Sequence, residues 1–118
     1  MTPGVYNFPA VKQGSTFKFQ FNWANELGVA VVLTGYTARL VVGYADGSPG
    51  SVLECSSANG RIVLGGTPYN ILGTVDRATM LALKPGNYVY DLELSSAGGE
   101  DYPLLTGRFP LVASVVGA

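Results

Sequence analysis

The segment 16–23, Thr-Phe-Lys-Phe-Gln-Phe-Asn-Trp, alternates strictly between polar and aromatic residues. A period of two places all the rings on one face of an extended strand and the polar side chains on the other. Each buried ring removes on the order of 150 to 250 Å² from water, so we expect this face at the centre of the core. The alternative is an exposed aromatic platform for carbohydrate, which a domain this small can hardly spare. The aromatic residues are Phe17, Phe19, Phe21 and Trp23.

Short alternating segments separated by Gly, Pro and Asn turns continue along the chain. We predict an extended segment at 28–34 and a hairpin of 51–55 with 61–64, joined through Asn59-Gly60. Gly107 is expected to allow a bulge between strands 102–106 and 108–115. Only 76–82 looks helical, for a turn or two that begins at Asp76. The other predicted strands are 37–44, 69–75 and 87–94.

Seven or eight short strands at this spacing are typical of an all-β antiparallel sandwich, immunoglobulin-like or related, with a closed barrel as second choice. The connection 83–88, Leu-Lys-Pro-Gly-Asn-Tyr, looks like the corner at which a Tyr hydroxyl ties down a loop in immunoglobulin-like sandwiches. Residues 1–14, with two prolines and two glycines, are predicted to be an extended N-terminal arm. Residues 15–118 are then a single β-sandwich domain, with a short extended end after Val115.

Composition excludes several classes of function. The 118 residues carry a net charge of −1 without any basic run, which argues against nucleic acid as a partner. Apolar runs are too short for a membrane span, and the first nine residues lack a secretory signal, so synthesis in a cytoplasm is expected. The chain has no histidine and only Cys55. Disulfides within the chain, the usual zinc sites and His-dependent catalysis are therefore not expected, and we predict no catalytic residue, no cofactor, no metal and no enzyme activity.

The remaining polar groups have ordinary structural explanations. Asp91 and Glu93 are two residues apart on one strand face, as a catalytic carboxylate pair can be, but an outward polar face paired with Arg39 or Arg108 explains them better. Two adjacent carboxylates at 100–101 make a poor calcium site without further oxygen ligands. Cys55 is expected to be a small buried residue, because no histidine is available to activate it.

Four motifs in order carry a resemblance to a known group. They are Gln-Gly-Ser-Thr at 13–16, Leu-Thr-Gly-Tyr-Thr-Ala-Arg at 33–39, Leu-Lys-Pro-Gly followed by Tyr-Val-Tyr-Asp-Leu-Glu-Leu within 83–94, and Leu-Leu-Thr-Gly-Arg at 104–108. Over roughly residues 13–115 the chain resembles the small β-sandwich proteins and domains of tailed bacteriophage virions, which include tail-fibre and baseplate-associated domains. The resemblance implies a structural or attachment role without catalysis, and it transfers no binding residues.

The expected function is therefore that of a phage virion structural protein, associated with the tail, tail fibre or baseplate. We expect it to assemble with copies of itself as a homo-oligomer, or with larger phage structural proteins, through its N-terminal arm, a sheet edge and the apolar end 111–116. Deleting residues 1–12 is expected to abolish assembly and leave the core folded. The alternatives are a capsid decoration protein and a carbohydrate-binding module. Such a module would use exposed tyrosines, of which the candidates are Tyr36, Tyr44, Tyr69 and Tyr102.

Overall fold

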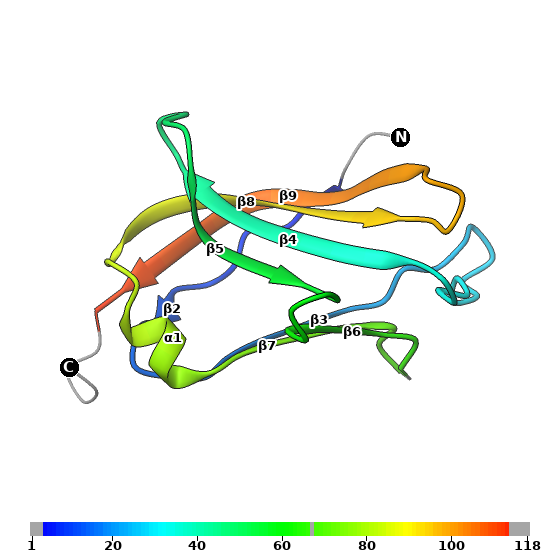
Figure 1. The fold of residues 1–118 in the computed structure, drawn as a ribbon, viewed down its shortest axis with the longest axis horizontal. Helices are drawn as coiled ribbons and strands as arrows, with labels where there is room; N and C mark the ends of the chain where they lie inside the picture. Colours follow the sequence, from blue (N-terminus) through cyan, green and yellow to red (C-terminus); the bar gives the residue numbers. More distant parts are fainter. Residues whose placement is uncertain (1–3, 67, 114–118) are drawn as a thin grey trace.

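The computed structural model describes residues 4–66 and 68–113, and nearly all of its regular structure is β-strand (Figure 1). The segment expected to be extended at 28–34 contributes only an isolated bridge, between Ala24 and Ala30. The elements in chain order are β1 (Gly4–Val5), β2 (Val11–Lys12), β3 (Phe17–Phe21), β4 (Thr37–Tyr44), β5 (Ser51–Ser56), β6 (Ile62–Leu64), β7 (Ile71–Val75), α1 (Arg77–Leu81), β8 (Gly86–Ser95) and β9 (Asp101–Val112).

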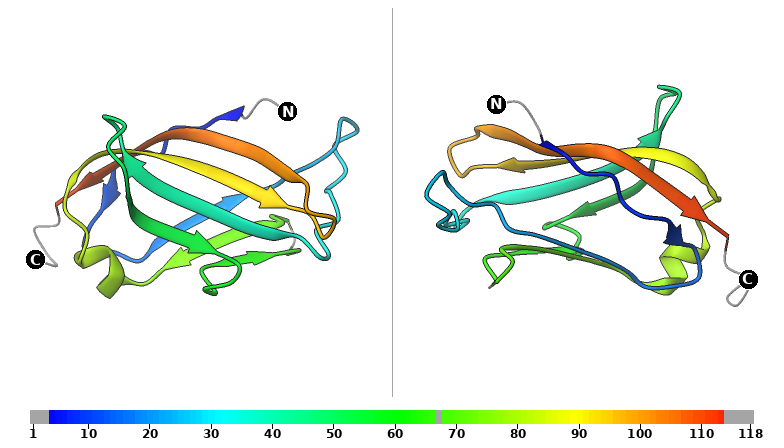
Figure 2. Two further views of the ribbon diagram at one scale, coloured as in Figure 1. Left: turned by 45° about the horizontal axis from the view of Figure 1, so that its top comes forward. Right: turned by 180° about the vertical axis from the view of Figure 1, so that it is seen from behind.

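The strands form two sheets that pack face to face, which confirms the predicted β-sandwich (Figures 1 and 2). The larger sheet has the order β1-β9-β8-β4-β5, with β2 also paired to β9, and the smaller has the order β3-β7-β6. All pairs are antiparallel except those of β1 and β2 with β9. This order is that of an immunoglobulin-like sandwich, in which β3, β7 and β6 take the places of strands B, E and D, and β4, β8 and β9 those of C, F and G.

The core follows the predicted alternation. Phe17 and Phe19 are buried, and on β8 the residues Tyr88, Tyr90, Leu92 and Leu94 point inward as expected. Trp23 lies beyond the end of β3 and is only half-buried. Immunoglobulin domains usually place a disulfide between strands B and F. Here buried aromatic rings from both sheets and the N-terminal segment fill the space between the layers. They include Phe8, Phe17, Phe19, Tyr90 and Phe109.

Two local predictions between β7 and β8 are confirmed. Asp76 is the N-cap of α1, and its carboxylate accepts a hydrogen bond from the backbone N–H of Thr79. At the following corner the hydroxyl of Tyr88 donates to the carbonyl oxygen of Lys84 at 2.5 Å. This bond fixes the connection into β8, as the sequence motif indicates.

The predicted hairpin of 51–55 with 61–64 is wrong. β5 pairs with β4 in the larger sheet, whereas β6 pairs with β7 in the smaller one, so the Asn59-Gly60 turn carries the chain between layers. The reason is burial: Leu53 and Ile62 each cover the core from their own sheet. A hairpin would place both strands in the same layer.

The bulge expected at Gly107 is also displaced. Residues 101–112 form one strand, and its register against β8 shifts between Leu105 and Pro103, which leaves Leu104 as the extra residue. Gly107 has a different task, because a Cβ there would collide with the carbonyl group of Tyr6. Its missing side chain allows the N-terminal segment to lie directly against β9.

Within the predicted N-terminal arm, residues 4–12 are extended and belong to the sandwich. β1 and β2 run parallel to β9 (Figure 2). Phe8, which lies between these two strands, and Val11, on β2, are each only 8% exposed. A domain boundary at residue 14 would remove both from the core they help to fill. Deleting residues 1–12 is therefore now expected to destabilise the fold. The end after Val115 lies outside the described residues.

The one helix of the described ranges, α1, is too short to cross a membrane.

Candidate functional site

β3 is an outer strand of the smaller sheet. The direction in which its backbone N–H and C=O groups point follows from the pairing of the next strand, β7, with β6. The backbone N–H of Thr74 on β7 donates to the carbonyl of Arg61, on the side of β6. Neighbouring residues of a strand direct their backbone groups to opposite sides, so Gly73 faces β3 and forms a hydrogen-bonded pair with Phe19. On β3, therefore, the backbone N–H and C=O groups that point toward β7 are those of Phe17, Phe19 and Phe21.

The backbone groups of Lys18 and Gln20 consequently face away from β7. Within the described ranges β3 pairs with no other strand, so these N–H and C=O groups line a free sheet edge. The side chains of both residues are exposed. A free edge of this kind is a template for an added strand.

β5 is an outer strand of the larger sheet and is similar in length to β3. Side chains cover its free edge. Glu54 directs its carbonyl oxygen outward, where it accepts hydrogen bonds from Asn59 Nδ2 at 3.0 Å and Arg61 Nη1 at 2.9 Å. The N–H of Ser56 donates to Asn59 Oδ1 at 3.0 Å. β6, at the far side of the smaller sheet, has only three residues. A covered edge and a very short edge strand are two ways in which proteins protect sheet edges. β3, with five residues, has neither of these two protections.

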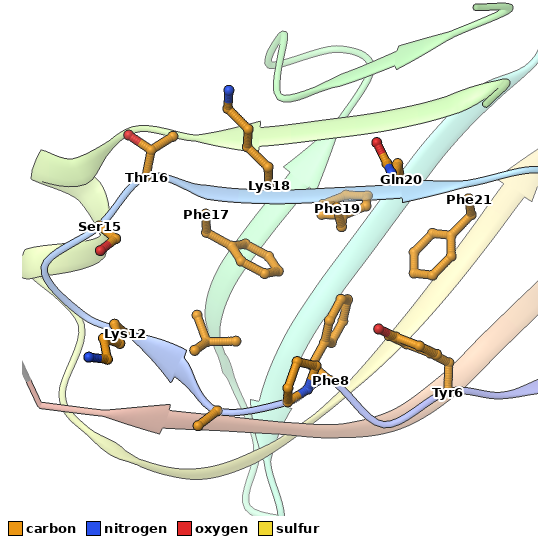
Figure 3. Close-up of a pocket in the computed structure, with 13 residues that line it drawn as sticks. Tyr6, Phe8, Lys12, Ser15, Thr16, Phe17, Lys18, Phe19, Gln20 and Phe21 are labelled. Atoms are coloured by element: carbon orange, nitrogen blue, oxygen red, sulfur yellow. The ribbon is translucent and has the colours of Figure 1, made fainter. Parts of the chain in front are cut away.

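A groove of about 630 Å³ opens beside this edge, between β3 and the N-terminal segment 6–12. Phe17, Phe19 and Phe21 point from β3 toward Phe8 and Tyr6 across the opening (Figure 3). The groove therefore has an aromatic floor and a free strand edge as one wall.

The aromatic rings hold one another in place. Phe8 contacts Phe17 edge-to-face with ring centroids 5.4 Å apart, and Tyr6 contacts Phe21 in the same way at 5.5 Å. Edge-to-face packing aligns the positive ring edge with the negative face of its neighbour. The floor of the groove is thus largely preformed, which lowers the conformational cost of binding.

Three partly buried hydrogen bonds fix the wall opposite β3. The hydroxyl of Tyr90 donates to the carbonyl of Tyr6 at 2.6 Å, and burial raises the pKa of that hydroxyl. At the turn into β3, Gln13 Nε2 donates to the carbonyls of Leu81 and Leu83 at 3.0 and 2.8 Å. The N-terminal segment is thereby attached to β8 and to the end of α1.

Charge is unevenly distributed around the groove. Among its lining residues the charged ones are Lys12 and Lys18, and no carboxylate accompanies them. Lys18 points away from the rings, on the outer side of β3 (Figure 3). The site is apolar within and cationic at its border.

The tyrosines considered for carbohydrate binding are divided among different places. Tyr36 and Tyr102 lie together with Trp23, but their rings are half-buried and the two tyrosine planes are inclined by 35°. Tyr102 donates its hydroxyl to Glu100 at 2.6 Å, a bond that raises the pKa of the phenol. Tyr44 packs on Tyr88, away from that cluster. The rings do not form a coplanar platform.

The two carboxylates considered as a catalytic pair lie on the outer face of β8. Asp91 and Glu93 are exposed on β8, and Glu93 lies directly across from Arg39 on β4. The ion pair of Arg39 is with Glu54, however, at 3.2 Å. Within residues 4–66 and 68–113 no three His, Cys, Asp or Glu side chains gather as a metal site would require.

Cys55 is buried, and this burial raises the pKa of its thiol to about 11. A thiol in such surroundings stays protonated near neutral pH, and the thiolate is the reactive form. The structure thus agrees with a packing role for Cys55.

The groove itself was not identified from the sequence. The alternation of 16–23 located the strand and its inward face, and a sheet edge was expected to serve assembly, but no local pattern says which strand is outermost. The position of β3 at a sheet edge depends on pairings between distant parts of the chain: β3 pairs with β7 alone among the described strands, and β1 and β2 pair with β9.

The fold and the groove together define an immunoglobulin-like β-sandwich in which, among the described residues, the five-residue strand β3 has an unpaired edge. No protein-family model matches the chain, and no curated protein sequence matches it at a significant level. Among solved structures, one of murine CRIg is similar, with a TM-score of 0.42 and 13% sequence identity over 97% of this chain and 95% of that chain.

Proposed function

We propose that this protein is a non-catalytic structural component that acts by assembly, in the virion of a tailed bacteriophage and at the tail, tail fibre or baseplate. The virion and tail assignments rest on the resemblance of the four ordered sequence motifs. The observation that carries the assembly mechanism is the free edge of β3 beside an aromatic groove. Copies of this chain and larger structural proteins of the particle are the proposed partners.

Strand addition is the mode of assembly that this edge supports. An added strand gains main-chain hydrogen bonds from Lys18 and Gln20 without any special side-chain motif. The groove adds an apolar contact beside those bonds. The carbohydrate-binding alternative has weaker support, because the rings of Tyr36 and Tyr102 are inclined and half-buried.

The test compares incorporation into particles of the wild-type protein with that of Gln20→Pro and Gln20→Ala. Proline removes the outward N–H and is tolerated at sheet edges, whereas alanine keeps that donor. We expect the proline variant to fold and to be lost from particles, and the alanine variant to be retained. Electron microscopy of labelled protein distinguishes the tail from the capsid surface, where a decoration protein would lie. Normal incorporation of a folded Gln20→Pro variant contradicts assembly through β3.

A further inference from the structure

We propose that the β3 groove accepts an extended segment of a different polypeptide, with apolar residues at alternate positions and carboxylates between them. This inference rests on the proposed function and specifies its partner. The segment pairs with Lys18 and Gln20 of β3 and becomes a fourth strand of the smaller sheet.

The required composition follows from the geometry of the edge. Side chains of an added strand alternate with those of β3, so every second one enters the groove over the ring of Phe8. These positions have to be apolar, since the floor is formed by aromatic rings. The intervening side chains emerge on the outer face beside Lys18 and Gln20, where opposite charges on neighbouring strands attract.

The charges favour a different chain over a second copy of this one. Lys12 and Lys18 border the groove without a carboxylate among its lining residues. Two copies joined by their β3 edges would bring like charges together. A flexible acidic segment fills the groove and balances the lysines.

The probe for this proposal is the blocked peptide Glu-Val-Glu-Val-Glu-Val-Glu, titrated into isotope-labelled full-length protein. We expect resonance shifts along β3 and slower amide exchange at Lys18 and Gln20, whose N–H groups face away from β7 and pair with no strand of the described ranges. A peptide of the same composition with its valines adjacent, and one with lysines in place of glutamates, serve as controls. Both are expected to bind at least about tenfold more weakly.

Two further changes separate pairing from folding. Gln20→Pro, compared with Gln20→Ala, is expected to weaken peptide binding about tenfold. Methylating alternate peptide nitrogens that face β3 has the same expected effect and leaves the protein unchanged.

The charge preference is tested separately. Lys18→Glu is expected to reverse the preference between acidic and basic peptides, and added salt is expected to reduce that preference.

Three results would overturn the proposal: no effect of the acidic peptide on β3, equal binding of acidic and basic peptides, or a self-associated protein whose β3 amides are already protected. The last result would make a second copy the occupant. Particle incorporation is measured separately. If Gln20→Pro is lost from particles but the acidic peptide does not bind, assembly through β3 stands and only the partner chemistry is wrong.

Discussion

The hydroxyl of Tyr90, in the middle of β8, donates a hydrogen bond to the carbonyl oxygen of Tyr6, 84 positions earlier in the chain and 2.6 Å away. This bond crosses beneath β9 at the point where Gly107 leaves room for the Tyr6 backbone. The N-terminal segment is therefore held by β8 as well as by the backbone of β9. Its position sets the width of the groove beside β3.

Replacing Tyr90 with phenylalanine removes this bond and leaves the Tyr6 carbonyl without that donor. We expect a loss of about 1 to 2 kcal/mol in the free energy of unfolding, measured by urea denaturation. Amide exchange at Tyr6 and Phe8, which donate to β9 carbonyls, should become faster. Tyr88→Phe is the matched control: it loses the bond to Lys84 and should not affect the N-terminal amides. Unchanged exchange at Tyr6 in Tyr90→Phe would contradict this role.

Phe19 covers Gly73, its partner on β7, so closely that a Cβ on Gly73 would collide with the ring. Truncating Phe19 to alanine is expected to cost about 3 to 5 kcal/mol, as for other buried aromatic residues. Gly73→Ala should cost about 1 to 3 kcal/mol in the wild-type background, because it overpacks the core. In a Phe19→Leu background the loss of stability caused by Gly73→Ala should be smaller. Equal costs in both backgrounds would mean that the ring does not restrict position 73.

Cys55 gives a prediction at alkaline pH. Its thiol has a pKa of about 11 in the folded chain, against an ordinary value of 9.0, because burial disfavours the thiolate. Between these values the unfolded chain releases the proton and the folded chain retains it, so this contribution to stability is present below pH 9 and lost as the pH rises toward 11. Urea midpoints should therefore fall less steeply with pH in Cys55→Ala than in wild type. Parallel curves would disprove the burial effect.

Asp91 tests the outward face of β8. The residue is exposed, and Asp91→Asn should change the free energy of unfolding by less than about 0.5 kcal/mol. Differential scanning calorimetry at neutral pH provides the measurement. A loss of several kcal/mol would show that this carboxylate has a structural or binding role that its exposed position does not indicate.

Local chemistry made much of the fold predictable. The period of two in 16–23 and 87–94 identified both strands and their buried faces, since alternation depends only on the geometry of one extended segment. The N-cap at Asp76 and the corner at Tyr88 bond to residues three and four positions away, so short motifs contained both partners.

Only the tertiary structure decided which strands are neighbours. The turn at Asn59-Gly60 is compatible with a hairpin, yet the burial of Leu53 and Ile62 on opposite layers separates its two strands. The segment 4–12 is extended in either description, but its place against β9 depends on Gly107 and Tyr90, which are far away in the sequence. The free edge of β3 has the same origin. Strand alternation is a local property, whereas an edge exists only because of where every other strand has paired.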